Sequence, residues 1–447
     1  MDKIQLSDHF TYKRLLRFVF PSITMMVFTS IYSVVDGLFV SNFVGKSPFT
    51  AINLIFPFFA LLGAFGFMFG TGGSAVVGIT LGMGEPKKAN RYFSMIVYVT
   101  VIWGLCLAIF GYSLMEHIAV FLGAEGDVLQ YCIVYGRILI WAIPMFMLGN
   151  VFQSFFVTSQ KPKLGLVVMV VGGVLNIVLD AVFIAGLGFG VQGAAMATAI
   201  GQISTGVLPL FYFCRKNDSL LRLGKTKFYP AVLLKTCVNG SSEMVGNLAY
   251  SLIYTVYNWQ VLKYTGEDGV AVYGVLQYMG FVFNAIFFGY AVGVSPIFSF
   301  HYGAGHKDEI QSLFRKSLRV VLSCGVVMFL LSQILAGPLA KLFVGYDETL
   351  RAMTVHAMHI YGCVFLFNGF CVLGSSFFTA LGNGKASALI SFLRTFVFEV
   401  ISVLVLPLFF GLNGIWSAAI VAEAVAVMVT IILLKSTEKS YFPAIEK

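Results

Sequence analysis

The chain has 447 residues, of which 58% are hydrophobic and only 11% are charged. A soluble globular protein carries roughly a quarter charged residues, so this composition excludes that class and indicates a protein that crosses a membrane many times. A formal net charge of +9 raises the alternative of a nucleic-acid-binding protein, but the placement of the basic residues argues against it.

Twelve segments are long and apolar enough to cross a bilayer, which takes about 20 largely apolar residues. In chain order they are 15–40, 52–80, 92–114, 129–156, 164–186, 191–214, 230–262, 270–300, 317–340, 350–380, 386–409 and 412–434. The sequence therefore predicts an all-α polytopic membrane protein with 12 transmembrane helices.

Lysine and arginine concentrate in every second connection, as the positive-inside rule requires of cytoplasmic loops. With the N-terminus inside, the inside segments hold 22 of these residues and the outside segments hold 4. This split predicts an inner or plasma membrane protein with both termini in the cytoplasm. It also accounts for the positive charge without nucleic acid.

Short motifs recur at a nearly constant offset along the chain. The pairs are LGMG at 81–84 with YGAG at 302–305, GVQG at 190–193 with GLNG at 411–414, and FFVTSQKPK at 155–163 with FFTALGNGK at 377–385. Six helices per repeat make the halves parallel, related by a pseudo-two-fold axis along the membrane normal, with a binding cleft between them. We expect an N-terminal lobe at 1–214, a cytoplasmic linker at 215–229 and a C-terminal lobe at 230–447.

The sequence lacks the motifs of several enzyme classes. It contains no GxxxxGK[ST] for ATP and no HExxH for zinc. The match to GxGxxG at 188–193 follows an apolar helix rather than a strand, so a dinucleotide site is rejected. We expect no enzyme activity, no catalytic residue, no resident metal and no cofactor, so uphill transport must use an ion gradient.

Ionisable residues inside the predicted helices are few, and inserting an Asp at a helix centre costs roughly 2.5–3.5 kcal/mol, so such residues are usually functional. They are Asp36, Arg137, Asp180, Glu243, Arg394, Glu399 and Glu423.

The segment 171–202 reads as two apolar helices joined by a glycine-rich turn. Asn176 and Asp180 are four residues apart and share a helix face, and Thr198 lies early in the second helix. The helical rise places these three residues and Asp36 in one layer, in the outer half of the first six helices.

Two carboxyl groups with amide and hydroxyl oxygens suit a proton or a hard cation such as sodium. Two buried acids cannot both ionise cheaply, so the pair is expected to titrate as a coupled unit. The alternative is a structural polar cluster that holds helices together. The repeat favours a function, because at an offset of 221 residues the four positions become Tyr257, Val397, Ile401 and Ala419.

These residues carry a resemblance to a known family. With Asp36 on helix 1, Asn176-x-x-x-Asp180 on helix 5 and Gly193-Ala-Ala-x-Ala-Thr198 opening helix 6, residues 10–435 resemble a multidrug and toxic compound extrusion (MATE) transporter. The resemblance implies that the two acids form a proton- or sodium-coupling site in the N-terminal lobe.

The same resemblance implies that Tyr135 and Asn150 on helix 4 join this network and that Pro21 is a hinge in helix 1. Some members have a second cation site in the C-terminal lobe, with acids on helices 7 and 10. Glu243 fits the first position, but helix 10 offers only Asn368, so this chain departs from the pattern.

The sequence leaves the roles of the other charged residues in the predicted C-terminal helices open. Glu243 either faces the cleft or pairs with Lys235, and Arg394 is expected to pair with Glu399 on the same helix. Glu423 has no assigned partner.

The sequence thus predicts a proton- or sodium-coupled antiporter that works as a monomer among membrane lipids and exports organic cations by alternating access. Its many aromatic and methionine residues suit flat lipophilic cations. The main alternative is a lipid-linked precursor flippase of the same superfamily, which needs a basic cleft for pyrophosphate. Only Arg137 and Arg394 are available for that role. A membrane-embedded enzyme and a channel are further alternatives.

Overall fold

The computed structural model describes residues 4–441, and the regular elements in that range are helices. The N-terminal half contains α1 Tyr12–Phe43, α2 Lys46–Gly82, α3 Pro86–Phe121, α4 Gly126–Leu139, η1 Ile140–Ala142, α5 Ile143–Thr158, α6 Pro162–Asp180, η2 Ala181–Gly186 and α7 Gly190–Cys214. The C-terminal half contains α8 Pro230–Gly303, α9 Lys307–Val344, α10 Glu348–Tyr361, η3 Gly362–Val364, α11 Phe365–Ala380, α12 Gly384–Ser391, η4 Phe392–Phe398, α13 Glu399–Phe410 and α14 Leu412–Tyr441.

The longest helix, α8, makes two membrane crossings. Its 74 residues would extend roughly 110 Å if straight, several times the thickness of a bilayer core. Gly266 breaks it with φ 65° and ψ −146°, a conformation that glycine adopts readily. In the described part of the chain 11 helices are long and apolar enough to span a membrane, so dividing α8 gives the 12 predicted crossings.

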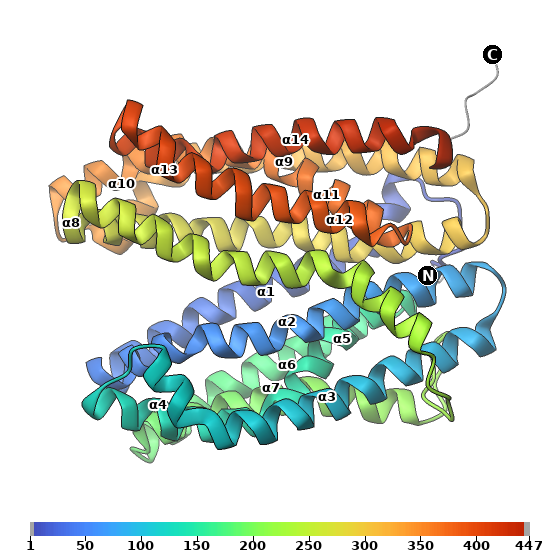
Figure 1. Ribbon diagram of the computed structural model, residues 1–447, viewed down its shortest axis with the longest axis horizontal. Helices are drawn as coiled ribbons and strands as arrows, with labels where there is room; N and C mark the ends of the chain where they lie inside the picture. The colour runs from blue at the N-terminus through green and yellow to red at the C-terminus, as the bar shows by residue number, and fades with distance from the viewer. Residues whose placement is uncertain (1–3, 442–447) are drawn as a thin grey trace.

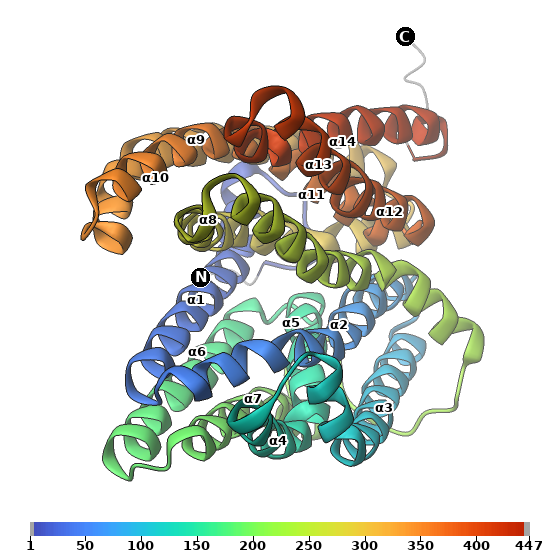
Figure 2. The same ribbon diagram turned by 60° about the vertical axis from the view of Figure 1, so that its left-hand side comes forward.

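The helices form two lobes, one from α1–α7 and one from α8–α14 (Figure 1). Residues 215–229 lead from the end of α7 to the start of α8 along the edge of the molecule (Figure 2). The predicted all-α, two-lobed fold is confirmed, whereas the residue boundaries of the lobes stay a prediction.

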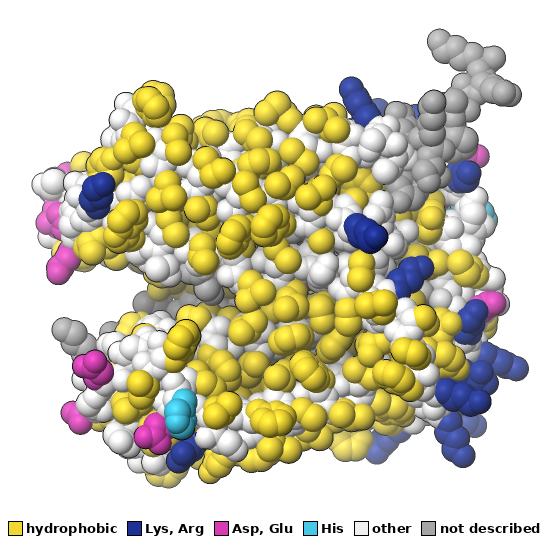
Figure 3. Space-filling model, viewed as in Figure 1, with side chains coloured by type: hydrophobic (Ala, Val, Ile, Leu, Met, Phe, Trp, Pro, Cys, Tyr) yellow, Lys and Arg dark blue, Asp and Glu magenta, His cyan; other side chains and the backbone are white. Residues whose placement is uncertain are grey.

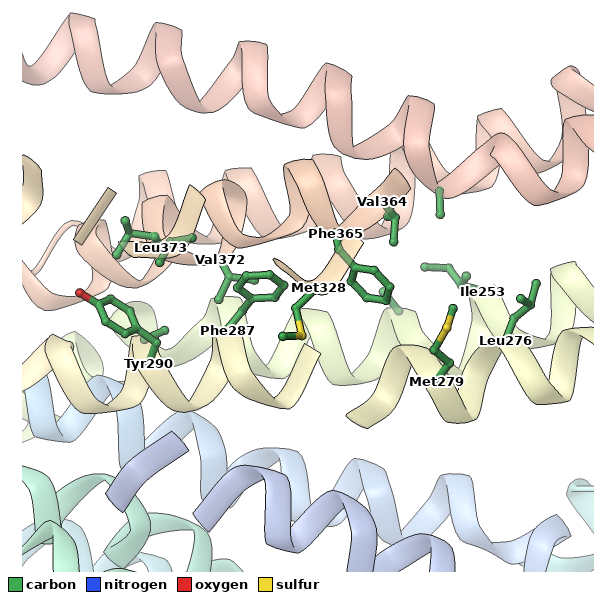
Figure 4. Close-up of a cluster of buried hydrophobic side chains, with 14 of the residues drawn as sticks. Ile253, Leu276, Met279, Phe287, Tyr290, Met328, Val364, Phe365, Val372 and Leu373 are labelled. Carbon is green, nitrogen blue, oxygen red and sulfur yellow. The ribbon is translucent and has the colours of Figure 1, made fainter. Parts of the chain in front are cut away.

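Each lobe has its own apolar core, and two helices cross between the cores. In the C-terminal lobe, Phe287, Met328 and Phe365 pack together (Figure 4). The first half of α1 joins this same core through buried Phe18 and Val19, although α1 begins the other lobe. Conversely, the start of α8 packs against the core of the N-terminal lobe.

The lobes meet at one end of the molecule and separate at the other. Lysines and arginines gather at one end (Figure 3), which we call the basic end, where the turns are 83–85, 159–161, 215–229, 304–306 and 381–383. At the opposite end, here called the open end, the surface is hollowed between the lobes (Figure 3). We call this hollow the cleft.

Candidate functional site

Glycines let three helices approach closely beside the predicted carboxyl site. A Cβ added to Gly201 on α7 would lie 2.9 Å from Cβ of Asn176 on α6. A Cβ on Gly173 of α6 would lie 2.8 Å from the ring of Phe28 and 3.3 Å from that of Tyr32, both on α1. Because these glycines have no side chain, the polar faces of α1, α6 and α7 can lie close together.

Asn176 links the three helices. Oriented to suit its neighbours, its amide nitrogen donates to Asp36 Oδ1 at 3.2 Å and its amide oxygen accepts from the Thr198 backbone N–H at 3.2 Å. The Asp36 and Asp180 carboxyl groups face each other within hydrogen-bonding reach. Tyr135 of α4 forms a side-chain hydrogen bond with Thr198.

The carboxyl pair lies in a largely dry environment. Asn176 is 0% and Asp180 is 1% exposed, whereas Asp36 is half-buried. Among the described residues, Asp180 Oδ1 has no hydrogen-bond partner. Two ionised carboxylates in such surroundings repel each other strongly, so this arrangement is suited to hold a proton or a small cation between them.

The structure brings together five of the six residues predicted for this network: Asp36, Tyr135, Asn176, Asp180 and Thr198. Asn150 lies elsewhere, because its amide nitrogen donates to the Gly63 carbonyl of α2 at 3.3 Å. Tyr135 and Asn150 occupy α4 and α5, and η1 and more than two helical turns lie between them. The ion-coupling roles of all six stay predictions.

Sequence reasoning missed Tyr32. Its side chain lies within electrostatic reach of Asp36, Tyr135 and Asp180. The signal was available, because Tyr32 precedes Asp36 by four residues and therefore shares its helix face.

Pro21 lies inside α1, which runs as one helix from Tyr12 to Phe43. It is buried where α1 passes along the C-terminal lobe. Proline removes one backbone hydrogen bond from a helix, so this position is locally weakened. Its role as a hinge stays a prediction.

The charges of the C-terminal lobe pair differently from the prediction. Arg394 Nε donates to Glu423 Oε1 at 2.7 Å, and Arg394 Nη2 donates to Asn368 Oδ1 at 2.9 Å. The expected pairing of Arg394 with Glu399 is therefore wrong. The reason is that α14 packs against η4 and presents Glu423 directly to the guanidinium.

Glu243 lies within electrostatic reach of Arg394. Within residues 4–441 no ion pair joins it to Lys235, so the alternative that these two residues pair is not supported.

Comparison with known proteins agrees with this geometry. The MatE family model matches residues 21–182 and 244–405, one stretch in each half of the chain. The multidrug export protein MepA of Staphylococcus saprophyticus is 26% identical over 95% of this chain and 94% of its own length. MepA of Staphylococcus haemolyticus is 25% identical over 95% and 93%.

Solved structures show the same fold. An outward-facing multidrug resistance MATE transporter is 22% identical with a TM-score of 0.92, covering 99% of both chains. A MATE transporter in complex with MaL6 is 21% identical with a TM-score of 0.93, covering 99% of this chain and 100% of its own. The chain therefore belongs to the MatE family and is a multi-pass membrane transporter rather than an enzyme.

Proposed function

We propose that the protein exports organic cations in exchange for protons or sodium ions, by alternating access to the cleft between its lobes. The names of its multidrug export relatives support the cargo class. The observation that carries ion coupling is the buried Asp36–Asp180 pair, with an unpartnered carboxylate oxygen among the described residues and with Asn176 and Thr198 beside it. No other cofactor is needed.

The path of α1 supports coupling between this site and the lobes. Its outer half places Tyr32 and Asp36 beside α6, while its inner half packs Phe18 and Val19 into the core of the C-terminal lobe. Neutralising the carboxyl pair changes how α1 is held at one end. Pro21, between the two halves, lets that change bend the helix and alter the contact between lobes.

The orientation of the protein follows from its charge distribution. We assign the basic end to the cytoplasm, as the positive-inside rule predicts, which places both termini there and turns the cleft outward. We propose a monomer as the working unit.

The flippase alternative finds little support in the two arginines that it would need. Arg394 is engaged by Glu423 and Asn368. Arg137 lies on an exposed surface with its guanidinium 5.4 Å from the ring centroid of Tyr112. Arg394 is therefore already engaged by other side chains, and Arg137 lies against a ring of α3.

Ethidium transport by purified protein in liposomes tests the proposal, with a proton gradient and a sodium gradient imposed separately. We expect one gradient to drive transport and Asp180→Asn to reduce that transport at least about tenfold, because a lost buried charge interaction is worth more than 1.4 kcal/mol. Asp127→Asn, an exposed acid in the first turn of α4, is the matched control.

Normal gradient-driven transport by Asp180→Asn would assign the carboxyl pair a purely structural role. Transport by the native protein that responds to neither gradient would reject ion coupling altogether.

A further inference from the structure

A group of tyrosines surrounds Glu399 in the C-terminal lobe. The Tyr257 hydroxyl donates to Glu399 Oε1 at 3.4 Å. The Tyr257 ring stacks on the Tyr273 ring with centroids 4.7 Å apart. The centroid of the Tyr254 ring lies 5.6 Å from that of the Tyr273 ring. Tyr250 also lies within electrostatic reach of the Glu399 carboxyl. We call these four tyrosines and Glu399 the tyrosine cluster.

The outer members of the cluster are accessible. Tyr250 is 49% and Tyr254 is 41% exposed, whereas Tyr257 and Tyr273 are buried behind them. Glu399 itself is half-buried. A ligand that reaches the two exposed rings therefore meets the carboxylate behind them.

The two exposed rings lie on the face of α8 that turns towards Glu399 of their own lobe. Gly240, Glu243, Asn247, Tyr250 and Tyr254 recur every three or four residues and so share one face of α8. At the basic end this face touches the N-terminal lobe, because a Cβ on Gly240 would overlap the Met68 carbonyl of α2. Towards the open end, where the lobes separate (Figure 3), the same face turns into the C-terminal lobe, because Tyr257, seven residues after Tyr250, is buried in the core of that lobe.

The opposite face of this part of α8 has a different character. It presents Leu248, Leu252 and Trp259, which are exposed and apolar. That face suits lipid, whereas the face with Tyr250 and Tyr254 presents aromatic hydroxyl groups beside a carboxyl group.

Glu399 lacks a fixed cation. The nearby guanidinium of Arg394 is bound by Glu423 and Asn368, and within the described range no ion pair of Glu399 occurs. Its contact with a tyrosine hydroxyl orients the carboxyl group without neutralising it. A carboxylate bordered by aromatic rings is the combination that attracts organic cations, through charge and through contacts with ring faces within about 6 Å.

Under the internal repeat, this cluster occupies the position in the C-terminal lobe that is equivalent to the N-terminal carboxyl site. Tyr257 follows Asp36 by 221 residues, and Ala419, whose backbone hydrogen-bonds to the Tyr257 side chain, follows Thr198 by 221. The N-terminal position presents two adjacent carboxyl groups, suited to a small ion. The equivalent C-terminal position presents one carboxylate among rings, suited to a larger and flatter cation.

We propose that the tyrosine cluster is the binding site for the organic cation, with Glu399 as its charge partner and Tyr250 and Tyr254 as stacking surfaces. The inference rests on the proposed export function, because it locates the cargo of that transport. In this proposal the two lobes bind different ligands: the N-terminal lobe binds the small ion and the C-terminal lobe binds the organic cation.

Equilibrium binding to the purified full chain in detergent tests this assignment without any gradient. The probes are tetraphenylphosphonium and tetraphenylborate, which have the same shape and opposite charges. We expect Glu399→Gln to weaken binding of the phosphonium about tenfold, or 1.4 kcal/mol, and to leave binding of the borate undiminished. A fold defect would reduce both, so equal losses, or no loss, would overturn the proposal.

The rings are tested by a second set of variants. Tyr254→Leu is expected to weaken phosphonium binding several-fold, while Tyr254→Phe retains it because the ring face is preserved. Tyr131→Leu, at an exposed tyrosine of α4 in the other lobe, is the matched control. Equal affinities of Tyr254→Leu and Tyr131→Leu would remove Tyr254 from the site.

This assay also separates the two proposals. Binding of tetraphenylphosphonium to the native protein and to Glu399→Gln is measured without a gradient, so its outcome does not depend on whether a gradient drives transport. If binding follows the expected pattern and neither gradient drives transport, the cargo site stands and ion coupling fails.

Discussion

Arg394 connects four membrane-spanning segments through side-chain hydrogen bonds. It lies in the π-helical segment η4 and binds Glu423 of α14 and Asn368 of α11, and Asn368 Nδ2 donates to Asn284 Oδ1 of α8 at 2.6 Å. The ion pair is nearly buried, with side-chain exposures of 14% for Arg394 and 9% for Glu423. The two opposite charges compensate each other in surroundings where a single unpaired charge would destabilise the protein.

Removing one member of this pair should therefore destabilise the protein more than removing both members. We expect Arg394→Met to destabilise the protein by roughly 3–5 kcal/mol, because it leaves the Glu423 carboxylate uncompensated. The double variant Arg394→Met/Glu423→Leu should recover most of that loss. Thermal unfolding in detergent, followed by tryptophan fluorescence, measures both.

Arg351→Met is the matched control, since Arg351 pairs with Glu348 on the surface one helical turn away, where such pairs contribute about 0–1 kcal/mol. A double variant as unstable as Arg394→Met would show that the arginine stabilises the lobe by packing rather than by compensating Glu423.

The segment before α1 is docked on the opposite lobe. Leu6 and Phe10 are fully buried in the core of the C-terminal lobe. Near the start of α9, Glu309 accepts from the Phe10 backbone N–H at 3.0 Å and lies 2.6 Å from His9 Nδ1. Lys316 Nζ donates to the Phe10 carbonyl at 2.6 Å. This docking fixes the basic end of α1 to α9.

Glu309→Ala should loosen this segment without unfolding the lobes. Hydrogen bonds to a charged group contribute about 1.5–3 kcal/mol each, so local opening should increase at least about tenfold. Limited trypsin cleavage at Lys13 and Arg14 reports that opening. Glu348→Ala, at an exposed acid near the start of another helix, should be cleaved at the native rate, and identical rates for the two variants would refute anchoring by Glu309.

Elements that depend on local sequence were predictable, and contacts between elements mostly were not. The crossings followed from apolar length, and the meeting of Asp36, Asn176 and Asp180 followed from helix spacing and depth. Pairing of Arg394 with Glu423 could not be read from spacing, because it depends on how α14 rotates against η4. The burial of Phe10 could not be predicted from the sequence either, because Phe10 packs against a lobe that lies some 300 residues away in the chain.

At the scale of the whole molecule, the lobes close against each other through backbone contacts. A Cβ on Gly82 of α2 would overlap the Phe300 carbonyl of α8, and a Cβ on Gly303 of α8 would overlap the Ile79 carbonyl of α2. The two contacts are equivalents under the repeat, because Gly303 follows Gly82 and Phe300 follows Ile79 by 221 residues. The basic end is therefore closed by a symmetric pair of glycine contacts that has no room for a side chain.

Alternating access requires this closure to open and re-form, so a single methyl group should shift the balance. We expect Gly82→Ala to separate the lobes at the basic end, because the new Cβ meets backbone rather than a flexible side chain. Cys237, which packs against the core of the other lobe, should then react with a maleimide on the order of tenfold faster, as a shift of about 1.4 kcal/mol would give. Peptide mass mapping measures the rate, with fully buried Cys132 as the internal reference.

Gly274→Ala provides the matched control, because a Cβ there meets nothing within 4 Å. In a helix that substitution should stabilise the folded protein by up to about 1 kcal/mol, and it should leave the balance between the closed and the open form unchanged. Faster labelling of Cys237 in Gly82→Ala alone would identify the glycine pair as the closure that the transport cycle must break. Equal labelling in both variants would mean that the lobes stay closed through the side-chain packing of α1 and α8, and that the glycines only permit the contact.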